Sequence, residues 1–384
     1  MTSSGSTSTV FRVVIAGAGV AGLEAALALR ELGGERFDVT LIAPDAEFVY
    51  RPMTVREPFA FADAERYEIS DIAQDIGVKL LVDSFAWVDP EQRLAHTEGG
   101  ERIHYDALIL ALGARPHARY RHGLTIDDRR LDEQLHGLIQ DIEGGYVHDL
   151  AFIVPPRMGW PLPIYELALM SARRAYDMNI KLKVTIATPE EAPLAIFGDG
   201  ASSAVSELLT DSAITTICSA DCEILDSRRV VINDGDRGFE VDRIVALPEL
   251  FGPAVRGLTA GEHGLIPIDE HCRVRGVERI YAAGDATDYA LKHGGIAAQQ
   301  ADTAVQAIAA FAGLPVEAMP FHPEIHGILL TGAAPRYLSA RVIGGRGFSS
   351  EITDTPTWSP ATKIAAKYLA PYLDARDRDS GARP

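Results

Sequence analysis

The chain has 384 residues, 47% of them hydrophobic, which is enough for two or three domains with a large buried core. Its formal net charge of −18, from 36 basic and 54 acidic side chains, argues against binding to nucleic acid and against contact with anionic membrane surfaces. The three cysteines are too few for a disulfide framework, and we expect Cys218 and Cys222 to be small buried side chains rather than a redox or metal pair.

Residues 1–9 are rich in Ser, Thr and Gly and lack the apolar stretch of a signal peptide, so we expect a disordered tail. No run of about 18 apolar residues occurs anywhere in the chain, so no transmembrane segment is expected. The resulting expectation is a cytoplasmic protein without a metal site.

A glycine-rich turn follows the first predicted strand. Apolar and β-branched residues dominate 11–16, as expected for a strand buried on both faces, and Gly17, Gly19 and Gly22 follow before a helical run over 23–30. In a G-x-G-x-x-G turn the first glycine permits the tight bend, the second lets the backbone approach a pyrophosphate, and the third lets the helix pack closely. The free amides at the helix start favour phosphate groups, so this segment predicts a dinucleotide site.

The second predicted strand, 37–42, ends without the acid that usually binds the adenosine ribose in dinucleotide-binding folds. Ala43 stands at the expected position, and Asp45 comes two residues later. Either Asp45 takes over the role, or backbone and water hold the ribose and Asp45 is a solvated turn residue.

Further strands follow before the middle of the chain. Residues 78–98 alternate in the way typical of a meander, whose first strand we place at 78–81. A buried strand within 105–112 ends in a turn of small residues. We interpret the polar stretch 117–149 as a crossing between domains.

A weak internal repeat begins near residue 150. A strand at 151–154, a helix at 164–176 and a strand at 181–187 are typical of a second dinucleotide-type unit. Its loop, 155–163, holds four prolines and one glycine. Proline has no amide hydrogen to give to a phosphate, so this proline loop argues against ordinary NAD(P)H binding without excluding it.

The last third returns to the first domain. A strand is expected within 239–248, and the loop 248–253 is predicted to be a second domain crossing. Residues 280–286 predict a buried strand that ends at a Gly-Asp pair, and a helix is expected to begin near His293. Residues 329–384 are expected to form a separate section.

In order, the glycine turn and the segments YDALILALGARP, IYAAGDAT and KHGGIAAQQA resemble the flavoprotein disulfide reductases with two dinucleotide domains, the pyridine nucleotide-disulfide oxidoreductase superfamily. Residues 160–168 are similar to a segment of the flavin subunit of flavocytochrome c sulfide dehydrogenase, in the branch of sulfide:quinone oxidoreductase and type II NADH dehydrogenase. The resemblance implies an α/β fold of two Rossmann-like domains, the second inserted in the first. The implied boundaries are 1–118 with 262–328 for the FAD-binding domain, 119–261 for a degenerate NAD(P)-type domain, and 329–384 for a small C-terminal section.

The resemblance also implies one FAD site made from distant parts of the chain. Asp285 would accept hydrogen bonds from the ribitol chain, and the helix that begins near Gly294 would direct its dipole at the flavin, where it favours the reduced anionic form. The full set implied to contact the cofactor is Gly17, Gly19, Gly22, Asp45, Arg51, Ala86, Ala111, Gly113, Gly284, Asp285, Gly294, Gly295 and Ile296.

The chain departs from its sulfide-oxidising relatives at their two redox cysteines. By the resemblance, the first falls at Trp160 and the second near His326. Sulfide oxidation through a disulfide needs a thiolate, so that mechanism is not expected here. Trp160 is a candidate for stacking near the flavin or on a planar substrate. His326 either acts as an acid or base, or packs as part of the wall.

Two more side chains complete the candidate catalytic set. Glu166 either relays protons beside the flavin or caps its own helix. Lys292 either lies near the flavin or is a solvated cap residue. The candidate catalytic residues are therefore Trp160, Glu166, Lys292 and His326.

An apolar stripe of Ile364, Tyr368 and Tyr372 predicts a C-terminal amphipathic helix, which Pro371 interrupts. Docking of this helix against the protein body is favoured over peripheral membrane contact.

The predicted function is an FAD-dependent oxidoreductase that takes two electrons from a small donor and passes them to a quinone-like or other small acceptor without a redox disulfide. Two alternatives remain open: an NAD(P)H:acceptor reductase, and an FAD-binding protein without turnover. A homodimer is one option for the oligomeric state.

Overall fold

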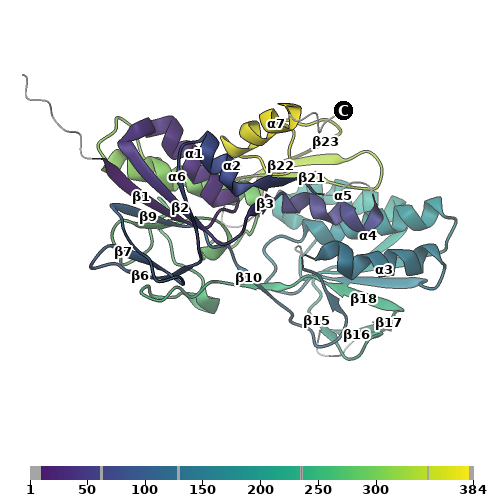
Figure 1. The fold of residues 1–384 in the computed structure, drawn as a ribbon. Helices are drawn as coiled ribbons and strands as arrows, with labels where there is room; N and C mark the ends of the chain where they lie inside the picture. The colour runs from purple at the N-terminus through teal and green to yellow at the C-terminus, as the bar shows by residue number, and fades with distance from the viewer. Residues whose placement is uncertain are drawn as a thin grey trace, which may run out of the picture.

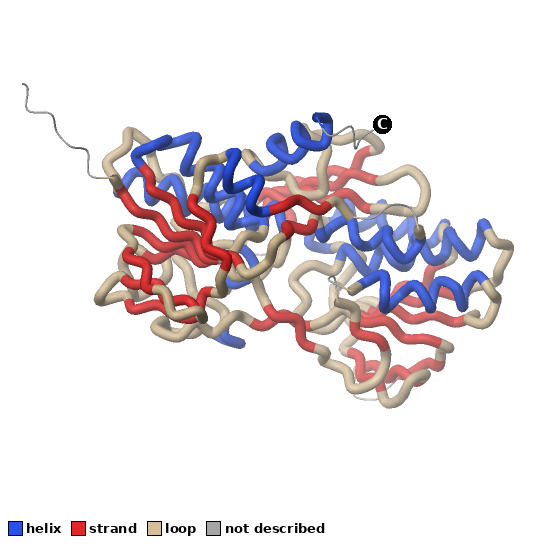
Figure 2. Tube along the Cα trace, viewed as in Figure 1, coloured by secondary structure: helices blue, strands red, loops and turns tan. Residues whose placement is uncertain are grey.

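The computed structural model describes residues 10–60, 64–127, 130–233, 235, 237–343 and 346–379. The expected N-terminal tail, 1–9, lies outside them. The chain forms two Rossmann-like α/β domains, the second inserted in the first, and a small C-terminal section (Figure 1). Figure 2 shows the same architecture as two groups of strands, each flanked by helices.

The first domain is built on a parallel five-stranded sheet, as the apolar strand at its centre predicts. Its order is β20 (Ile280–Ala282), β9 (Ala107–Leu110), β1 (Phe11–Ala16), β2 (Phe37–Ala43) and β5 (Lys79–Val82). Two long helices, α1 (Val20–Gly33) and α6 (Gly294–Phe311), pack against each other and lie side by side in Figure 1. The smaller elements of this region are η1 (Gly34–Arg36), β3 (Glu47–Val49), η2 (Arg51–Phe59), β4 (Arg66–Glu68), α2 (Ile69–Asp75), η4 (Glu262–Gly264) and η5 (Gly284–Ala286).

The predicted meander is only partly correct. Strands β6 (Phe85–Asp89), β7 (Leu94–Thr97) and β8 (Arg102–His104) form an antiparallel sheet of three strands. Its first strand was expected at 78–81, but this segment forms β5, which pairs in parallel with β2 at the edge of the main sheet. A half-buried edge strand and a meander strand both alternate apolar and exposed positions, so periodicity alone did not separate them.

The inserted domain has its own parallel sheet. The order is β11 (Leu124–Thr125), β18 (Arg243–Ala246), β12 (Asp149–Ile153), β13 (Lys183–Ala187) and β14 (Ile214–Ile217). Helices α3 (Leu131–Glu143), α4 (Leu162–Asp177) and α5 (Asp199–Asp211), the short η3 (Ala195–Phe197), and the antiparallel strands β15 (Cys222–Ile224), β16 (Arg229–Ile232) and β17 (Arg237–Glu240) complete it.

Two predictions about this domain are wrong. The stretch 117–149 is not simply a crossing, because it contains α3, which buries a stripe of leucines and isoleucines. The charged outer face of α3 dominates its composition and hid this stripe. The single strand expected within 239–248 is two strands, β17 and β18, which belong to different sheets. The two passages of the chain between the main sheets do pair, as β10 (Arg115–His117) and β19 (Glu249–Phe251), in an antiparallel ribbon.

The C-terminal section comprises an antiparallel sheet of β21 (Glu324–Leu329), β22 (Arg336–Ile343) and β23 (Arg346–Thr353), followed by α7 (Leu369–Asp379). The helix begins later than the apolar stripe predicts, so Ile364 and Tyr368 lie before it. Pro371 falls in its first turn, where no intrahelical donor is lost, and so does not interrupt it.

Helix α7 docks on the first domain, as was favoured from the sequence. Leu369 and Leu373 are buried, and the Tyr372 hydroxyl donates a hydrogen bond to Asp75 of α2 at 2.7 Å. Within the described part of the chain, no helix combines the length and apolarity needed to cross a bilayer.

Candidate functional site

Three segments that are far apart in the sequence meet at the carboxyl edge of the first sheet. Strands β20, β9 and β1 are neighbours, so the turns that follow them, at Gly284, Ala111 and Gly17, lie together. A Cβ built on Gly284 would lie 3.5 Å from the Cβ of Ala21 in the first turn of α1. The two ends of the predicted cofactor site therefore converge.

The three glycines of the first turn have distinct environments. Gly17 has a φ of 106°, and a Cβ there would lie 2.2 Å from the carbonyl oxygen of Ala111. A Cβ on Gly22 would lie 1.8 Å from the carbonyl oxygen of Gly17. Gly19 is exposed, and among the described residues nothing lies within 4 Å of its Cβ position. This open space at the start of α1, where backbone amides have no intrahelical partner, fits a pyrophosphate.

The other cofactor candidates are distributed around this edge. Asp45 is exposed just after β2, and Arg51 is exposed at the start of η2. Gly113 has a φ of 67° with open space at its Cβ position, whereas Ala86 lies in β6, outside the main sheet. Gly284 and Asp285 begin η5, Gly294 and Gly295 begin α6, and the Ile296 side chain is buried in the core.

Lys292 is held within the site region. Its ammonium donates to the carbonyl oxygen of Thr287 at 2.6 Å. Burial lowers the pKa of Lys292, and the carboxylates of Asp285 and Asp288 oppose that shift. It is therefore not a solvated cap residue, and it lies close enough to Asp285 to feel its charge.

Trp160 and His326 are linked through His293, the residue that precedes α6. The Trp160 and His293 ring centroids lie 4.2 Å apart, and His293 in turn feels the charge of His326. The other side of His326 contacts Trp358, with ring centroids 4.9 Å apart. Burial lowers the pKa of His293 to about 3, and the pKa of His326 is lowered for the same reason, so both imidazoles are neutral near pH 7. The Nδ1 atoms of both rings are buried without a hydrogen-bond partner in the described structure.

Glu166 forms a buried ion pair with Lys363 of the C-terminal section. The Lys363 ammonium lies 2.6 and 2.7 Å from the two carboxylate oxygens, and it also donates to the carbonyl oxygen of Pro52 at 2.9 Å. The backbone amide of Leu330 donates to Glu166 at 2.9 Å. Burial raises the pKa of Glu166 and lowers that of Lys363, so each charge depends on the other. Glu166 thus joins three parts of the chain and does not serve merely as a helix cap.

In the inserted domain, the acid that follows the second strand of the dinucleotide-type unit is hydrogen-bonded by protein side chains. The Tyr165 hydroxyl donates to Glu190, which follows β13, at 2.6 Å, and Thr188 donates to the same oxygen at 2.9 Å. Tyr165 is fully buried, and burial raises the pKa of Glu190 to about 7. A Cβ on Gly159 of the proline loop would lie 2.3 Å from the carbonyl oxygen of Ala290, so this loop packs tightly on the first domain.

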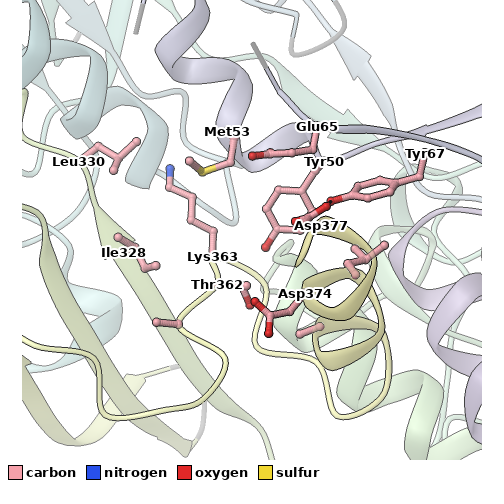
Figure 3. Close-up of a pocket in the computed structure, with 13 residues that line it drawn as sticks. Tyr50, Met53, Glu65, Tyr67, Ile328, Leu330, Thr362, Lys363, Asp374 and Asp377 are labelled. Atoms are coloured by element: carbon pink, nitrogen blue, oxygen red, sulfur yellow. Dashed lines mark hydrogen bonds between the residues drawn. The ribbon is translucent and has the colours of Figure 1, made fainter. Parts of the chain in front are cut away.

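A cavity of about 130 Å³ lies between the first domain and the C-terminal section (Figure 3). Met53, Ile328 and Leu330 give it an apolar side, and Lys363 lies in its wall. Tyr67 donates to the carboxylate of Asp377 at 2.7 Å on the opposite side. The complete lining is Tyr50, Met53, Glu65, Tyr67, Ile328, Leu330, Ala361, Thr362, Lys363, Ala370, Leu373, Asp374 and Asp377.

Sequence reasoning missed several residues of this site. His293 was treated only as a helix start, although a histidine directly before two glycines is a detectable signal. Glu190 was also detectable, as an acid just after a strand of a dinucleotide-type unit. Nothing in the spacing of the chain signals Lys363 or Trp358, because their partners are far away in sequence. Among the described residues, no group of three or more His, Cys, Asp or Glu side chains is arranged to hold a metal ion.

Comparisons with known proteins agree on the family. The family model for pyridine nucleotide-disulphide oxidoreductases matches residues 11–142 and 166–309. The alternative NAD(P)H-ubiquinone oxidoreductase C1 of Arabidopsis thaliana, chloroplastic/mitochondrial, is 25% identical over 347 residues, or 77% of this chain. The match covers 65% of that relative, so the chain spans just under two thirds of its length.

Solved structures share the fold. The sulfide:quinone oxidoreductase of Aquifex aeolicus has a TM-score of 0.76 at 17% identity, with 96% of this chain and 90% of that chain covered. A ferredoxin reductase from Rhodopseudomonas palustris has a TM-score of 0.65 at 19% identity, with 87% and 83% covered. With the family match over most of the sequence and the converging glycine turns beside it, the chain belongs to the pyridine nucleotide-disulphide oxidoreductase family.

Proposed function

We propose that this protein takes two electrons from a small donor other than NAD(P)H and passes them to a quinone-like or other small acceptor, without a redox disulfide. The observation that carries this proposal is the contact between Tyr165 and Glu190. Glu190 is the first acid after β13, where dinucleotide-binding units commonly place the acid that binds the ribose, and it is already bonded by two protein hydroxyls.

The proline loop supports the same conclusion. Arg157 binds Glu249 of β19 with 2.5 Å between the charged atoms, which ties the loop to the ribbon between the domains. The loop offers few amides to a phosphate, because four of its nine residues are prolines. The family match is also interrupted over 143–165, the segment that contains this loop.

FAD, when bound, supplies the two-electron chemistry, and the protein supplies its position and electrostatic surroundings. We assign Gly17, Gly19 and Gly22 to the pyrophosphate, and Asp285 to the ribitol chain. The start of α6 at Gly294 and Gly295 would favour negative charge on the cofactor. Asp45, Arg51, Ala86, Ala111, Gly113, Gly284 and Ile296 complete the proposed cofactor-binding set.

Four side chains are proposed to serve the reaction. Trp160 presents a flat apolar face and excludes water. His326, with His293 beside it, offers a neutral imidazole nitrogen that can accept a hydrogen bond from a substrate. The Glu166 and Lys363 pair holds a proton at the wall of the cavity, where an acceptor ring of quinone size would sit. Lys292 places a positive charge near Asp285.

One observation favours a second candidate. The Arabidopsis relative is named an NAD(P)H-ubiquinone oxidoreductase, so an NAD(P)H:acceptor reductase is the rival function. The two differ in whether nicotinamide reduces the flavin.

Anaerobic stopped-flow mixing of the FAD-loaded protein with NADH or NADPH separates them. We expect no loss of flavin absorbance within seconds, whereas dithionite-reduced protein is reoxidised by a water-soluble quinone. Saturable bleaching by either nicotinamide overturns the proposal in favour of the rival. Failure of every small acceptor to reoxidise the reduced flavin would favour an FAD-binding protein without turnover.

A further inference from the structure

The segment that precedes α7, residues 361–368, runs as a strap from the wall of the cavity to helix α1. At its start Lys363 pairs with Glu166, and the backbone amide of Ile364 donates to the hydroxyl of Tyr50 at 2.8 Å. A Cβ on Gly294 would lie 2.9 Å from the Ile364 side chain, so the strap packs directly on the start of α6. The strap therefore covers the end of α6 that is proposed to face the cofactor.

Glu24 of α1 holds the far end of the strap. Its carboxylate is fully buried and accepts hydrogen bonds from the backbone amides of Tyr368 at 2.9 Å and Leu369 at 2.5 Å. These amides belong to the start of α7, whose own first turn contains no acidic side chain. Glu24 thus supplies, from another helix, the negative cap that α7 lacks.

Asp302 of α6 is the second carboxyl group at this point. It interacts with Glu24, and its Oδ1 is shielded from solvent with no hydrogen-bond partner in the described structure. Burial and the adjacent Glu24 carboxylate raise the pKa of Asp302 to about 8, which keeps it protonated near pH 7. The charged groups that face the pair are these two carboxyls, one on α1 and one on α6, and Lys367 on the strap.

We propose that Glu24 and Asp302 are positioning residues that share one proton and latch the C-terminal strap over the start of α6. Loss of that proton loosens the strap and with it the wall of the cavity formed by residues 361–363. The latch is independent of which donor or acceptor the protein uses, so it stands or falls separately from the proposed function.

The direction of the pH dependence follows from the two states of Asp302. In the latched state its pKa is about 8, whereas a solvated Asp302 in the open state returns towards its ordinary value near 4. Between these values the latched state binds one more proton than the open state. Rising pH therefore favours opening by up to about tenfold per pH unit, and the effect ends above about pH 8, where both states have lost the proton.

Hydrogen exchange of the FAD-loaded, full-length protein tests the latch. Peptides that cover 361–373 are followed from about pH 5.5 to about pH 9.5, with intrinsic exchange rates divided out. We expect the opening constant of the wild type to rise up to about tenfold per pH unit and to level off near pH 8. In Asp302→Asn the side-chain amide can donate to Glu24 as a protonated carboxyl would, but it does not titrate, so the pH slope of the opening constant should vanish.

Two further variants control the experiment. Asp75→Ala removes the acceptor of the Tyr372 hydroxyl and with it a contact of α7 with α2, so it should raise the opening constant while keeping the pH slope. Glu24→Gln replaces one of the two accepting oxygens with an NH2 group that faces a backbone amide, so it should open the strap at every pH. A flat wild-type profile overturns the latch even if no variant folds, and so does an Asp302→Asn profile with the wild-type slope.

Discussion

At the scale of single residues, Gly19 and Gly22 show why two glycines in one motif do different work. Gly22 has no room for a methyl group, because the carbonyl of Gly17 fills the Cβ position. Gly19 has room, so folding does not explain its identity. A ligand that approaches the backbone explains it, as the proposed pyrophosphate does.

We expect Gly19→Ala to leave the free energy of unfolding within about 0.5 kcal/mol of the wild type and to raise the FAD dissociation constant at least about tenfold. Gly22→Ala is the matched control, which should destabilise the fold by about 1–3 kcal/mol through overpacking. Chemical denaturation and flavin fluorescence titration measure the two quantities. Unchanged FAD affinity in Gly19→Ala would remove the assigned role of this turn.

The Glu166 and Lys363 pair gives a second prediction at this scale. Lys363→Met leaves a buried carboxylate without its cation, which should cost about 3–5 kcal/mol in the free energy of unfolding. The double variant Glu166→Gln with Lys363→Met should recover much of that loss, because no uncompensated charge remains. Equal stabilities of Lys363→Met and the wild type, measured by urea denaturation, would contradict the buried pair.

At the scale of elements, the unit β12, α4 and β13 has the order of a dinucleotide-binding unit, and the acid that follows β13 is bonded by protein hydroxyls. Tyr165 from the first turn of α4 reaches Glu190 beyond β13, and the proline loop packs on the other domain. The element order alone predicts the unit correctly. Whether such a unit has room for a dinucleotide depends on side chains that follow its two strands.

The environment of Glu190 can be tested through the pH dependence of the free energy of unfolding. The Glu190 pKa of about 7 in the folded protein lies above the ordinary glutamate value of 4.5, so the folded state binds the extra proton between these values. Stability should therefore fall as pH rises from about 4.5 to about 7, by about 3 kcal/mol, and change little through this group above that range. Urea denaturation of Glu190→Gln should show a shallower pH dependence than the wild type. An identical pH dependence in the two proteins would contradict the buried, protonated state of Glu190.

At the scale of the whole molecule, charge and docking act together. The chain carries a net charge of −18, and the apolar residues of α7 are turned into the first domain. We therefore expect no co-sedimentation with phosphatidylserine vesicles at about 0.1 M salt, because neither the charge nor the helix face favours the surface. Vesicles of neutral lipid are the control, and pelleting of the protein with the anionic vesicles alone would contradict the prediction.

The sequence by itself determined the class of fold, and it predicted the segments that converge at the carboxyl edge of the first sheet. Turns such as that at Gly17 to Gly22, and buried strands such as β9, are local patterns, because backbone conformation and strand burial depend on neighbouring residues. The sequence also indicated correctly that α7 docks on the body. The sequence did not separate an edge strand of the main sheet from a strand of the meander at β5, because both alternate apolar and exposed residues. It also did not reveal α3, because charged residues on the outer face of this helix obscure its apolar stripe.

Only the tertiary structure decided which side chains meet. Lys363 contacts Glu166, which is 197 residues away in the sequence, and Tyr368 contacts Glu24, which is 344 residues away. The tertiary structure also brought His293 between Trp160 and His326, and it placed the Tyr165 hydroxyl against Glu190. Such contacts depend on how helices and sheets pack in three dimensions, and packing between distant elements leaves no periodic signal in a single chain.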